Sequence, residues 1–231
     1  MGHQSTPRIS ATVVIPCRDE AESLPAIIRA LPADIDALVV DNGSVDGTAE
    51  VAAALGCTVV HQPLPGYGSA VHAGVEACTT EIVCTIDGDG SMDPADLSRL
   101  VCAVAAGADL AVGRRRPVDR RTWPLHSRLG TQWIARRLRN RYGIPIHDIG
   151  PMRAVRRDDL LGLGITDRRF GYPVELLARA GAARWQIAEL DITYRSRSGG
   201  RSKVSGSLKG TLRATRDFLT VLHQMEERVV H

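Results

Sequence analysis

The chain has 231 residues, of which 44% are hydrophobic, and a formal net charge of +3, which suits one large α/β domain or two small ones rather than a disordered chain. It contains no apolar run long enough to span a membrane, and residues 1–8 lack the apolar core of a signal peptide. The five cysteines are spaced neither as CxxC pairs nor as Cys/His metal ligands, so we expect reduced core thiols in a cytoplasmic protein.

Apolar segments alternate with helical patterns along the first half of the chain. Strands are expected at residues 11–16, 37–40, 57–61, 83–86 and 110–112. Helices are expected at residues 20–31, 69–77 and 94–106, and in the alanine-rich stretch that ends at residue 55. Such alternation predicts an α/β fold with a mostly parallel central sheet and helices on both faces.

The pattern changes after Gly113. A basic loop at residues 114–121 is followed by an amphipathic helix within 123–142, strands at 149–155 and 184–194, and a helix at 172–180. A loop rich in Ser, Gly and Arg covers residues 196–206. We therefore divide the chain into a flexible N-terminus (residues 1–10), two halves of one domain (11–113 and 114–206) and a C-terminal amphipathic helix (207–231).

Two carboxylates stand directly after the strand expected at residues 83–86. Asp87 and Asp89 are separated by one glycine and followed by Asp93 and Pro94. Ligands of an open α/β sheet bind where the strands end at their carboxyl edge, and two close carboxylates repel unless a cation lies between them. Mg²⁺ suits this place, because it binds carboxylates and bridges to substrate phosphates. An acidic turn in which Asp93 caps a helix beginning at Pro94 explains the same residues.

Positive charge gathers in the second half of the chain. Residues 114–141 contain ten arginines and a single acid, Asp119. Such a field suits phosphates, an anionic membrane face or nucleic acid. In the helix within residues 123–142, an apolar face with leucines and a tryptophan opposes an arginine face, which fits an interfacial helix on an anionic membrane. A domain helix whose apolar stripe packs on the core explains this pattern as well.

Several segments, in the correct order from about Thr12 to Lys209, resemble family 2 glycosyltransferases, in particular the polyprenyl-phosphate (dolichol-phosphate) mannosyl- and glucosyltransferase branch. The segments are Val14-Ile15-Pro16 with Glu20 and Glu22, the run from Val39 to Thr48, Asp87-Gly88-Asp89, the runs Asp148 to Arg153 and Phe170 to Leu176, and Arg195 to Lys203. The chain departs from the usual pattern of the branch in carrying Cys17-Arg18 for Tyr-Asn, Asn42 for Asp, Gly88 for Ala or Thr, Ser91 for Gln, and Pro151-Met152 for Ser-Gly.

The resemblance implies a single GT-A (Rossmann-like) domain, a nucleotide-sugar donor of the UDP-glucose or GDP-mannose type, and Mg²⁺ or Mn²⁺. It implies that Asp89 is the main, catalytic metal ligand and that Asp87 binds the metal or the ribose. It further implies a nucleotide-sugar site made of Pro16, Arg18, Glu20, Asp41, Asn42, Gly66, Gly68, Asp87 and Gly88. Gly66 and Gly68 would let the backbone pass close to the nucleotide, although a plain turn also uses such glycines.

Members of this family invert the anomeric centre in one displacement, and the acceptor decides what else the site needs. A polyprenyl phosphate is already ionised at neutral pH, so it requires cations to hold it rather than a strong base. The candidate phosphate-binding residues are Arg114, Arg153, Arg195, Arg201 and Lys203. A hydroxyl acceptor would instead need a carboxylate base, for which Asp148 and Glu175 are the candidates.

Three functional interpretations follow. The first is metal-dependent hexosyl transfer to a polyprenyl phosphate, with peripheral contact at the inner face of the membrane or a membrane partner. The second keeps the fold and the donor but uses a soluble hydroxyl or metabolite acceptor. The third is a basic nucleic-acid-binding module, disfavoured because only 4% of residues are aromatic and no recognised motif accompanies the arginines. A dinucleotide dehydrogenase is also disfavoured, because Pro16 to Asp19 stand where a GxGxxG turn would be needed.

Overall fold

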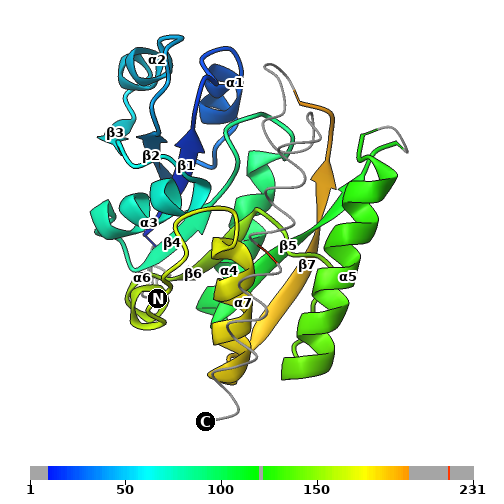
Figure 1. Cartoon of the computed structure of the whole chain (residues 1–231). Helices are drawn as coiled ribbons and strands as arrows, with labels where there is room; N and C mark the ends of the chain where they lie inside the picture. Colours follow the sequence, from blue (N-terminus) through cyan, green and yellow to red (C-terminus); the bar gives the residue numbers. More distant parts are fainter. Residues whose placement is uncertain (1–9, 120–121, 198–217, 219–231) are drawn as a thin grey trace, which may run out of the picture.

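Seven strands lie side by side in one sheet, in the order β3-β2-β1-β4-β6-β5-β7 (Figure 1). The structure, a computed structural model, describes residues 10–119, 122–197 and 218. The strands are β1 (Ala11–Cys17), β2 (Ile35–Asp41), β3 (Thr58–His61), β4 (Ile82–Thr85), β5 (Leu110–Pro117), β6 (Arg153–Arg156) and β7 (Ile187–Tyr194). Of these seven, β6 alone runs antiparallel to its neighbours, β4 and β5. The prediction of a mostly parallel central sheet is confirmed.

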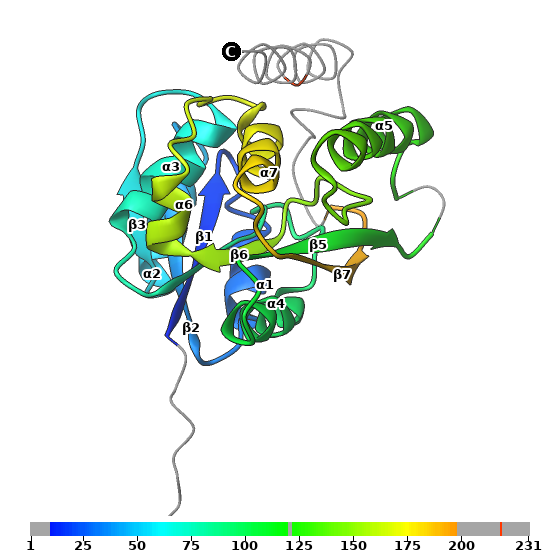
Figure 2. The same ribbon diagram turned by 90° about the horizontal axis from the view of Figure 1, so that it is seen from below.

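Helices cover both faces of the sheet. They are α1 (Leu24–Arg29), α2 (Thr48–Ala54), α3 (Tyr67–Ala77), α4 (Leu97–Ala105), α5 (Leu125–Tyr142), α6 (Arg157–Gly162) and α7 (Tyr172–Ala182), with a short 3₁₀ helix, η1 (Pro94–Asp96), before α4. Figure 2 shows α3, α5, α6 and α7 on one side of the sheet and α1 and α4 on the other. Successive residues of β1 serve the two cores in turn, since Val14 packs on the α3 side and Val13 and Ile15 pack on the α1 side.

The strands and helices predicted between residues 11 and 194 are present, with shifted bounds. α1 begins at Leu24 rather than Glu20, because Pro25 occupies the first turn of the helix and residues before it form a turn. α6 was not predicted, since six residues are too few to display a helical period. Asp93 does cap η1, because its carboxylate accepts the N–H of Ala95 at 3.2 Å.

The prediction of a basic loop at residues 114–121 is wrong in its first part. β5 continues through three arginines to Pro117 and pairs in parallel with β7, where Arg114 lies opposite Asp191 and Pro117 opposite Tyr194. Side chains alternate across a strand, so Arg114 and Arg116 leave one face of the sheet and Arg115 leaves the other. The arginine run therefore delivers positive charge to both faces.

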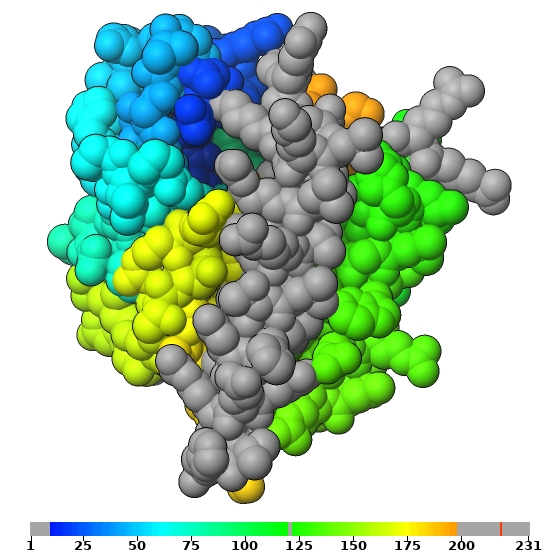
Figure 3. Space-filling model, in the orientation of Figure 1, coloured from blue at the N-terminus to red at the C-terminus, as the bar shows by residue number. Residues whose placement is uncertain are grey.

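Figure 3 shows residues 11–77, in blue to cyan, on one side of the face in view and α5, in green, on the other, while the yellow segment that contains α7 lies beside the cyan one. The division at residue 113 remains a prediction. The predicted N-terminal segment before Ser10, the part of the predicted loop after Arg197, and the predicted C-terminal helix apart from Phe218 lie outside the described residues.

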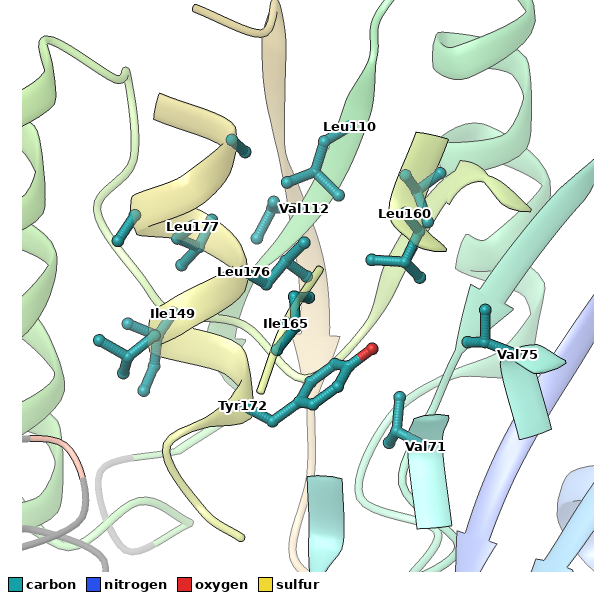
Figure 4. Packing of buried hydrophobic residues seen from close by; sticks show 14 of the residues in the cluster. Val71, Val75, Leu110, Val112, Ile149, Leu160, Ile165, Tyr172, Leu176 and Leu177 are labelled. Atoms are coloured by element: carbon teal, nitrogen blue, oxygen red, sulfur yellow. The ribbon is translucent and has the colours of Figure 1, made fainter. Parts of the chain in front are cut away.

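α3 lies unusually close to the sheet because one of its residues has no side chain. A Cβ atom on Gly74 would come within 2.3 Å of Val14 Cγ1 and 2.9 Å of Val40 Cγ2. On the same helix Val71 lies beside Tyr172 of α7, so α3 joins the sheet to the helices of the second half (Figure 4). The close approach fixes the start of α3 against the carboxyl edge of the parallel strands.

Replacing Gly74 by alanine is therefore expected to lower the free energy of unfolding by about 1–3 kcal/mol, because the added methyl group overpacks a core that cannot yield easily. The matched control is Gly130→Ala in α5, where a Cβ atom would meet nothing within 4 Å. That variant should gain roughly 0.5–1 kcal/mol, because alanine is the better helix former. Urea unfolding of both variants measures the difference, and equal stabilities would contradict the close packing of α3.

Candidate active site

Three loops, at residues 16–20, 41–48 and 87–89, meet at the carboxyl edge of β1, β2 and β4, where ligands of such sheets bind. The first two are joined by the N–H of Asn42, which donates to the carbonyl of Cys17 at 2.9 Å, and by the N–H of Asp19, which donates to Ser44 Oγ at 3.0 Å. The third is joined by Ser23, whose hydroxyl donates to the carbonyl of Gly88 at 2.6 Å. The structure thus brings together the loops at residues 16–20, 41–48 and 87–89 that the sequence proposed for the nucleotide-sugar site; Pro16 is partly buried and Arg18 is exposed there.

Asp87 and Asp89 follow β4 in this edge. Asp89 is 4% exposed; its Oδ1 accepts the N–H of Ser91 at 2.9 Å, and its Oδ2 lies 3.0 Å from Arg197 Nη2. Burial and the neighbouring Asp89 carboxylate raise the pKa of Asp87 to about 6, although Arg115, Arg197 and Arg153 act in the opposite direction. The three arginines therefore do not fully offset burial and the repulsion between the two carboxylates, and a further cation would stabilise the pair.

The two aspartates fit Mg²⁺ or Mn²⁺ by the chemistry of their oxygens. Carboxylate oxygens are the hard ligands that these ions prefer. One oxygen of Asp89 already contacts the guanidinium of Arg197, so the site accommodates a cation. Within the part of the chain that the structure describes, no group of three His, Cys, Asp or Glu side chains is placed to hold a metal. Mg²⁺ commonly uses one or two protein carboxylates and takes its other ligands from water and substrate phosphates, which suits an aspartate pair.

Asp41 and Asn42 lie side by side at the end of β2 but differ in what their side chains do. Asp41 is buried, its Oδ1 accepts the N–H of Ser44 at 3.1 Å, and its Oδ2 lies 3.5 Å from His61 Nδ1. Asn42 uses its amide on the next loop, donating to two carbonyls, of Gln62 and Leu64, and accepting the N–H of Gly66. Asn42 therefore shapes residues 62–66, a positioning task that the sequence did not reveal.

Gly66 and Gly68 are required by a contact within the protein. Gly66 has φ 149°, and a Cβ atom on it would lie 2.2 Å from the carbonyl oxygen of Arg168. A Cβ atom on Gly68 would lie 2.7 Å from Cβ of Tyr172. The N–H of Gly68 donates to the carbonyl of Arg169 at 3.0 Å. In this structure, the segment that lies close to the backbone of Gly66 and Gly68 is therefore residues 167–169.

Gly88 and Cys17 explain two departures from the usual family pattern together. A Cβ atom on Gly88 would come within 2.7 Å of Cys17 Sγ. Cys17 is 1% exposed and ends β1, so its sulfur occupies the space in which a side chain at position 88 would lie. A larger residue within Asp-x-Asp would therefore require the Cys17 side chain to shift, so two positions far apart in the sequence depend on each other.

Asp148, predicted as a candidate base, is locked in an ion pair. Arg115 donates from Nε to Oδ2 and from Nη2 to Oδ1, each at 2.8 Å, and its backbone N–H adds a third bond at 3.0 Å. Burial alone would raise the pKa of Asp148, but the charge and the hydrogen bonds of Arg115 outweigh burial and hold the pKa below its usual value. Arg115 also stacks on the ring of Trp123 at 4.0 Å, with Tyr194 at 5.5 Å. This arrangement holds the Arg115 guanidinium in place and disfavours the predicted role of Asp148 as a base, which stays a prediction.

Glu175, the other candidate base, is equally occupied. Its carboxylate accepts the N–H groups of Thr166 at 3.1 Å and Asp167 at 2.7 Å, and Arg179 Nε at 2.6 Å. Burial acts to raise the pKa of Glu175, and these donors lower it overall. A carboxylate with a depressed pKa and no spare oxygen is a poor proton acceptor. Glu175 holds the loop at residues 165–169, which disfavours its predicted role as a base; that role stays a prediction.

Arg153, a predicted phosphate-binding residue, lies inside the domain close to the carboxylate pair. It is 3% exposed; its Nη2 donates to the carbonyl of Ile149 at 2.5 Å, and it hydrogen-bonds the hydroxyl of Tyr67. Its Nε has no acceptor among the described residues. Burial, with a contribution from Asp87, raises the pKa of Tyr67 to about 12, so the phenol stays neutral. The sequence pointed to Arg153 and missed Tyr67, which no motif marks.

The other predicted phosphate-binding cations are spread more widely. Arg114 Nη1 lies 3.9 Å from Glu189 Oε2, on the face of the sheet opposite to Arg115. Arg195 Nη1 lies 3.2 Å from Asp93 Oδ2, and its N–H donates to the carbonyl of Ser91. Arg201 and Lys203 lie outside the described residues. No common phosphate site of all five cations can therefore be drawn within residues 10–197.

Arg197 is a site residue that the sequence reading did not single out. Its Nη2 lies 3.0 Å from Asp89 Oδ2 and its Nη1 3.8 Å from Glu20 Oε1, so it joins two of the loops at the sheet edge. The signal was present, because arginines alternate after β7 and Arg195 also reaches an aspartate of the 89–93 segment. The sequence does not show which of the two arginines, Arg195 or Arg197, contacts Asp89.

Comparisons with known proteins agree on one family. The family model described as Glycosyl transferase family 2 matches residues 12–163. An uncharacterized glycosyltransferase of Mycobacterium tuberculosis is 58% identical over 213 residues, which are 92% of this chain and 98% of that protein. The polyprenol monophosphomannose synthase of Mycolicibacterium smegmatis is 35% identical over 84% of this chain and 81% of its own length.

Solved structures show the same fold. Glucosyl-3-phosphoglycerate synthase from Mycobacterium tuberculosis, crystallised with Mn²⁺, UDP and glucosyl-3-phosphoglycerate, has a TM-score of 0.74 at 20% identity, over 94% of this chain and 79% of its own. The same enzyme with Mg²⁺ and UDP has a TM-score of 0.76 at 21% identity, over 94% of this chain and 79% of its own. The predicted GT-A fold and enzyme class are thereby confirmed, and they replace the nucleic-acid-binding alternative. The chain is a glycosyltransferase that belongs to glycosyl transferase family 2, with relatives in the polyprenyl-phosphate branch.

Proposed function

We propose that this glycosyltransferase moves a hexose from a UDP-glucose- or GDP-mannose-type donor to a polyprenyl phosphate, using Mg²⁺ or Mn²⁺. The observation that carries the proposal is that Asp87 and Asp89 lie beside Arg115, Arg153 and Arg197, whereas the two candidate bases, Asp148 and Glu175, are each held in an ion pair. Among the described residues, this arrangement offers cations and occupies the candidate bases, which suits an acceptor that arrives already ionised.

In the donor half, Asp89 and Asp87 would hold the metal, and Asp41 would accept a hydrogen bond from the base or ribose. When bound, the metal stabilises the charge that develops on the diphosphate leaving group. Asn42 accepts the N–H of Gly66 and so holds the loop at residues 62–66, which would lie beside the nucleotide. These assignments rest on the shared sheet edge and on the GT-A fold.

In the acceptor half, Arg153 is the strongest of the predicted phosphate-binding residues. Its guanidinium is buried near Asp87, held at Nη2 by Ile149, and its Nε has no acceptor among the described residues. Asp148 holds Arg115 in the same region through a bidentate pair. Two arginines fixed by packing can orient a phosphate oxygen for in-line attack, because little of their freedom is lost on binding. We propose a single displacement with inversion, in agreement with the family resemblance.

A soluble acceptor is the second candidate, because relatives of this fold include glucosyl-3-phosphoglycerate synthase, crystallised with a phosphoglycerate product. The test is transfer of radiolabelled glucose or mannose to a short polyprenyl phosphate or to 3-phosphoglycerate. We expect label in the lipid fraction; label only on phosphoglycerate would favour the soluble acceptor.

The same assay on Glu175→Gln tests the role of the carboxylate. If Glu175 only anchors the loop, its replacement should lower the transfer rate less than about tenfold. The melting temperature should also fall, because Arg179 loses a charged partner. If Glu175 is a general base, its replacement should lower the rate about 10²–10⁴-fold. A loss of that size in a variant with the wild-type melting temperature would contradict the phosphate acceptor.

The exposed face of α5 is a candidate surface for contact with a membrane that carries a lipid acceptor. The apolar residues recognised in the sequence divide between two faces: Ile134 and Leu138 are buried in the core, whereas Leu125 (68%), Leu129 (56%) and Trp133 (48%) are exposed. Packing on the core therefore accounts for Ile134 and Leu138, and the exposed residues leave a second face for which a membrane surface is a candidate partner. Arginines surround the exposed apolar residues on α5: Arg128, Arg136, Arg137 and Arg141, all exposed. We propose that this face lies on an anionic membrane surface, with the leucines and tryptophan at the interface.

None of the described helices combines the length and the apolar character that a bilayer crossing demands.

Replacing Leu129 and Trp133 together by serine should weaken binding to vesicles of phosphatidylcholine and phosphatidylglycerol about tenfold, because half-exposed apolar area no longer enters the interface. Leu64→Ser is the matched control, since Leu64 is also 56% exposed but lies in the loop at residues 62–66. Sedimentation with the vesicles measures both variants. Equal binding of the double variant and the wild type would show that α5 does not meet the membrane.

A further inference from the structure

A positive side chain already occupies the carboxylate to which a metal would bind. The guanidinium of Arg197 contacts Asp89 Oδ2 at 3.0 Å and reaches Glu20 Oε1 at 3.8 Å. Both carboxylates are well covered, with 5% of the Asp89 side chain and 11% of the Glu20 side chain exposed. Ion pairs sheltered from water in this way are stronger than exposed pairs, because the surrounding dielectric is lower.

Three arginines act on Asp87, but only Arg197 is placed to leave. Arg115 is held by both oxygens of Asp148 and stacked on Trp123. Arg153 is buried within the sheet. The side chain of Arg197 is 31% exposed and follows the end of β7, so it can swing into solvent without disturbing the core.

A divalent cation and Arg197 cannot share Asp89 Oδ2 at full strength. A metal ion binds the oxygen lone pairs directly and carries two positive charges, so it repels a guanidinium that contacts the same oxygen. We therefore expect the metal ion and Arg197 to compete for the Asp89 carboxylate, so that each binds it better when the other is absent.

We propose that Arg197 is an internal cation that takes the metal's place at Asp89, with Glu20 as its second partner, and that metal binding displaces it. Displacement turns the guanidinium away from the carboxylates and makes its donors available to a phosphate group of a substrate. Arg197 is thus a positioning residue whose place depends on whether the metal is bound. The inference rests on the metal site in the proposed function.

The test is the affinity for Mn²⁺ alone, without nucleotide, read from the electron paramagnetic resonance signal of free Mn²⁺. If the two cations compete, Arg197→Ala should bind Mn²⁺ about tenfold more tightly than the wild type, a typical coupling between two ligands. Arg195→Ala is the matched control: it removes the same charge two positions away, but its partner is Asp93. That variant should change the affinity less than about twofold. An equal gain in both variants, or none in Arg197→Ala, would overturn the proposal.

A second measurement needs no variant. In the wild-type protein, a dicarbonyl reagent should modify Arg197 faster once Mn²⁺ is added, as read by mass spectrometry of the peptide; an unchanged rate would contradict displacement. Asp89→Asn separates this inference from the proposed function. Mn²⁺ binding that survives Asp89→Asn counts against the metal site itself, whereas binding lost in Asp89→Asn but unaffected by Arg197→Ala refutes only the role of Arg197.

Discussion

The repulsion between Asp87 and Asp89 is the constraint on which the rest of the site depends. Two unit charges about 4 Å apart repel by about 4 kcal/mol at an effective dielectric constant of 20. The pair is tolerated because cations reach it from three elements of the second half of the chain: Arg115 from β5, Arg153 from β6 and Arg197 after β7. The first half of the chain thus presents negative charge that the second half partly neutralises.

Besides the shared core, backbone hydrogen bonds connect the two halves. Glu175 in α7 holds the loop at residues 165–169, and that loop accepts the N–H groups of Gly68 and Ser69 at the start of α3. Gly66, one turn earlier, is held in turn by Asn42 at the end of β2. A change at residues 165–175 can therefore reach the carboxyl edge of β2 through parts that have little freedom to move independently.

The sequence alone was sufficient for the fold and for the carboxylate pair. Alternating strands and helices predict the parallel sheet, and an apolar run that ends in Asp87-Gly88-Asp89 places two acids at its carboxyl edge. The family resemblance added the order of the motifs. Each of these signals is local, or repeats along the chain, which is why it could be recognised without coordinates.

What the sequence did not reveal depends on contacts between distant segments. Asp148 and Glu175 look like free acids until Arg115 and the N–H groups of residues 166–167 are placed on them. Arg197 and Arg195 are equivalent until one is seen to face Asp89. The extension of β5 was hidden because arginines are unusual in a central sheet, and its pairing with β7 is long-range.

The central claim is that Asp87 and Asp89 hold a cation on a nucleoside diphosphate. It is tested most directly by melting the protein with UDP or GDP, each with and without Mn²⁺, in the wild type and in Asp89→Asn. A ligand at a hundred times its dissociation constant stabilises the folded state by about 2.7 kcal/mol, which corresponds to roughly 5–10 °C for a chain of this size. We expect such a rise for one nucleotide, only with Mn²⁺ and only in the wild type. A rise that does not depend on Mn²⁺, or that persists in Asp89→Asn, would contradict the claim.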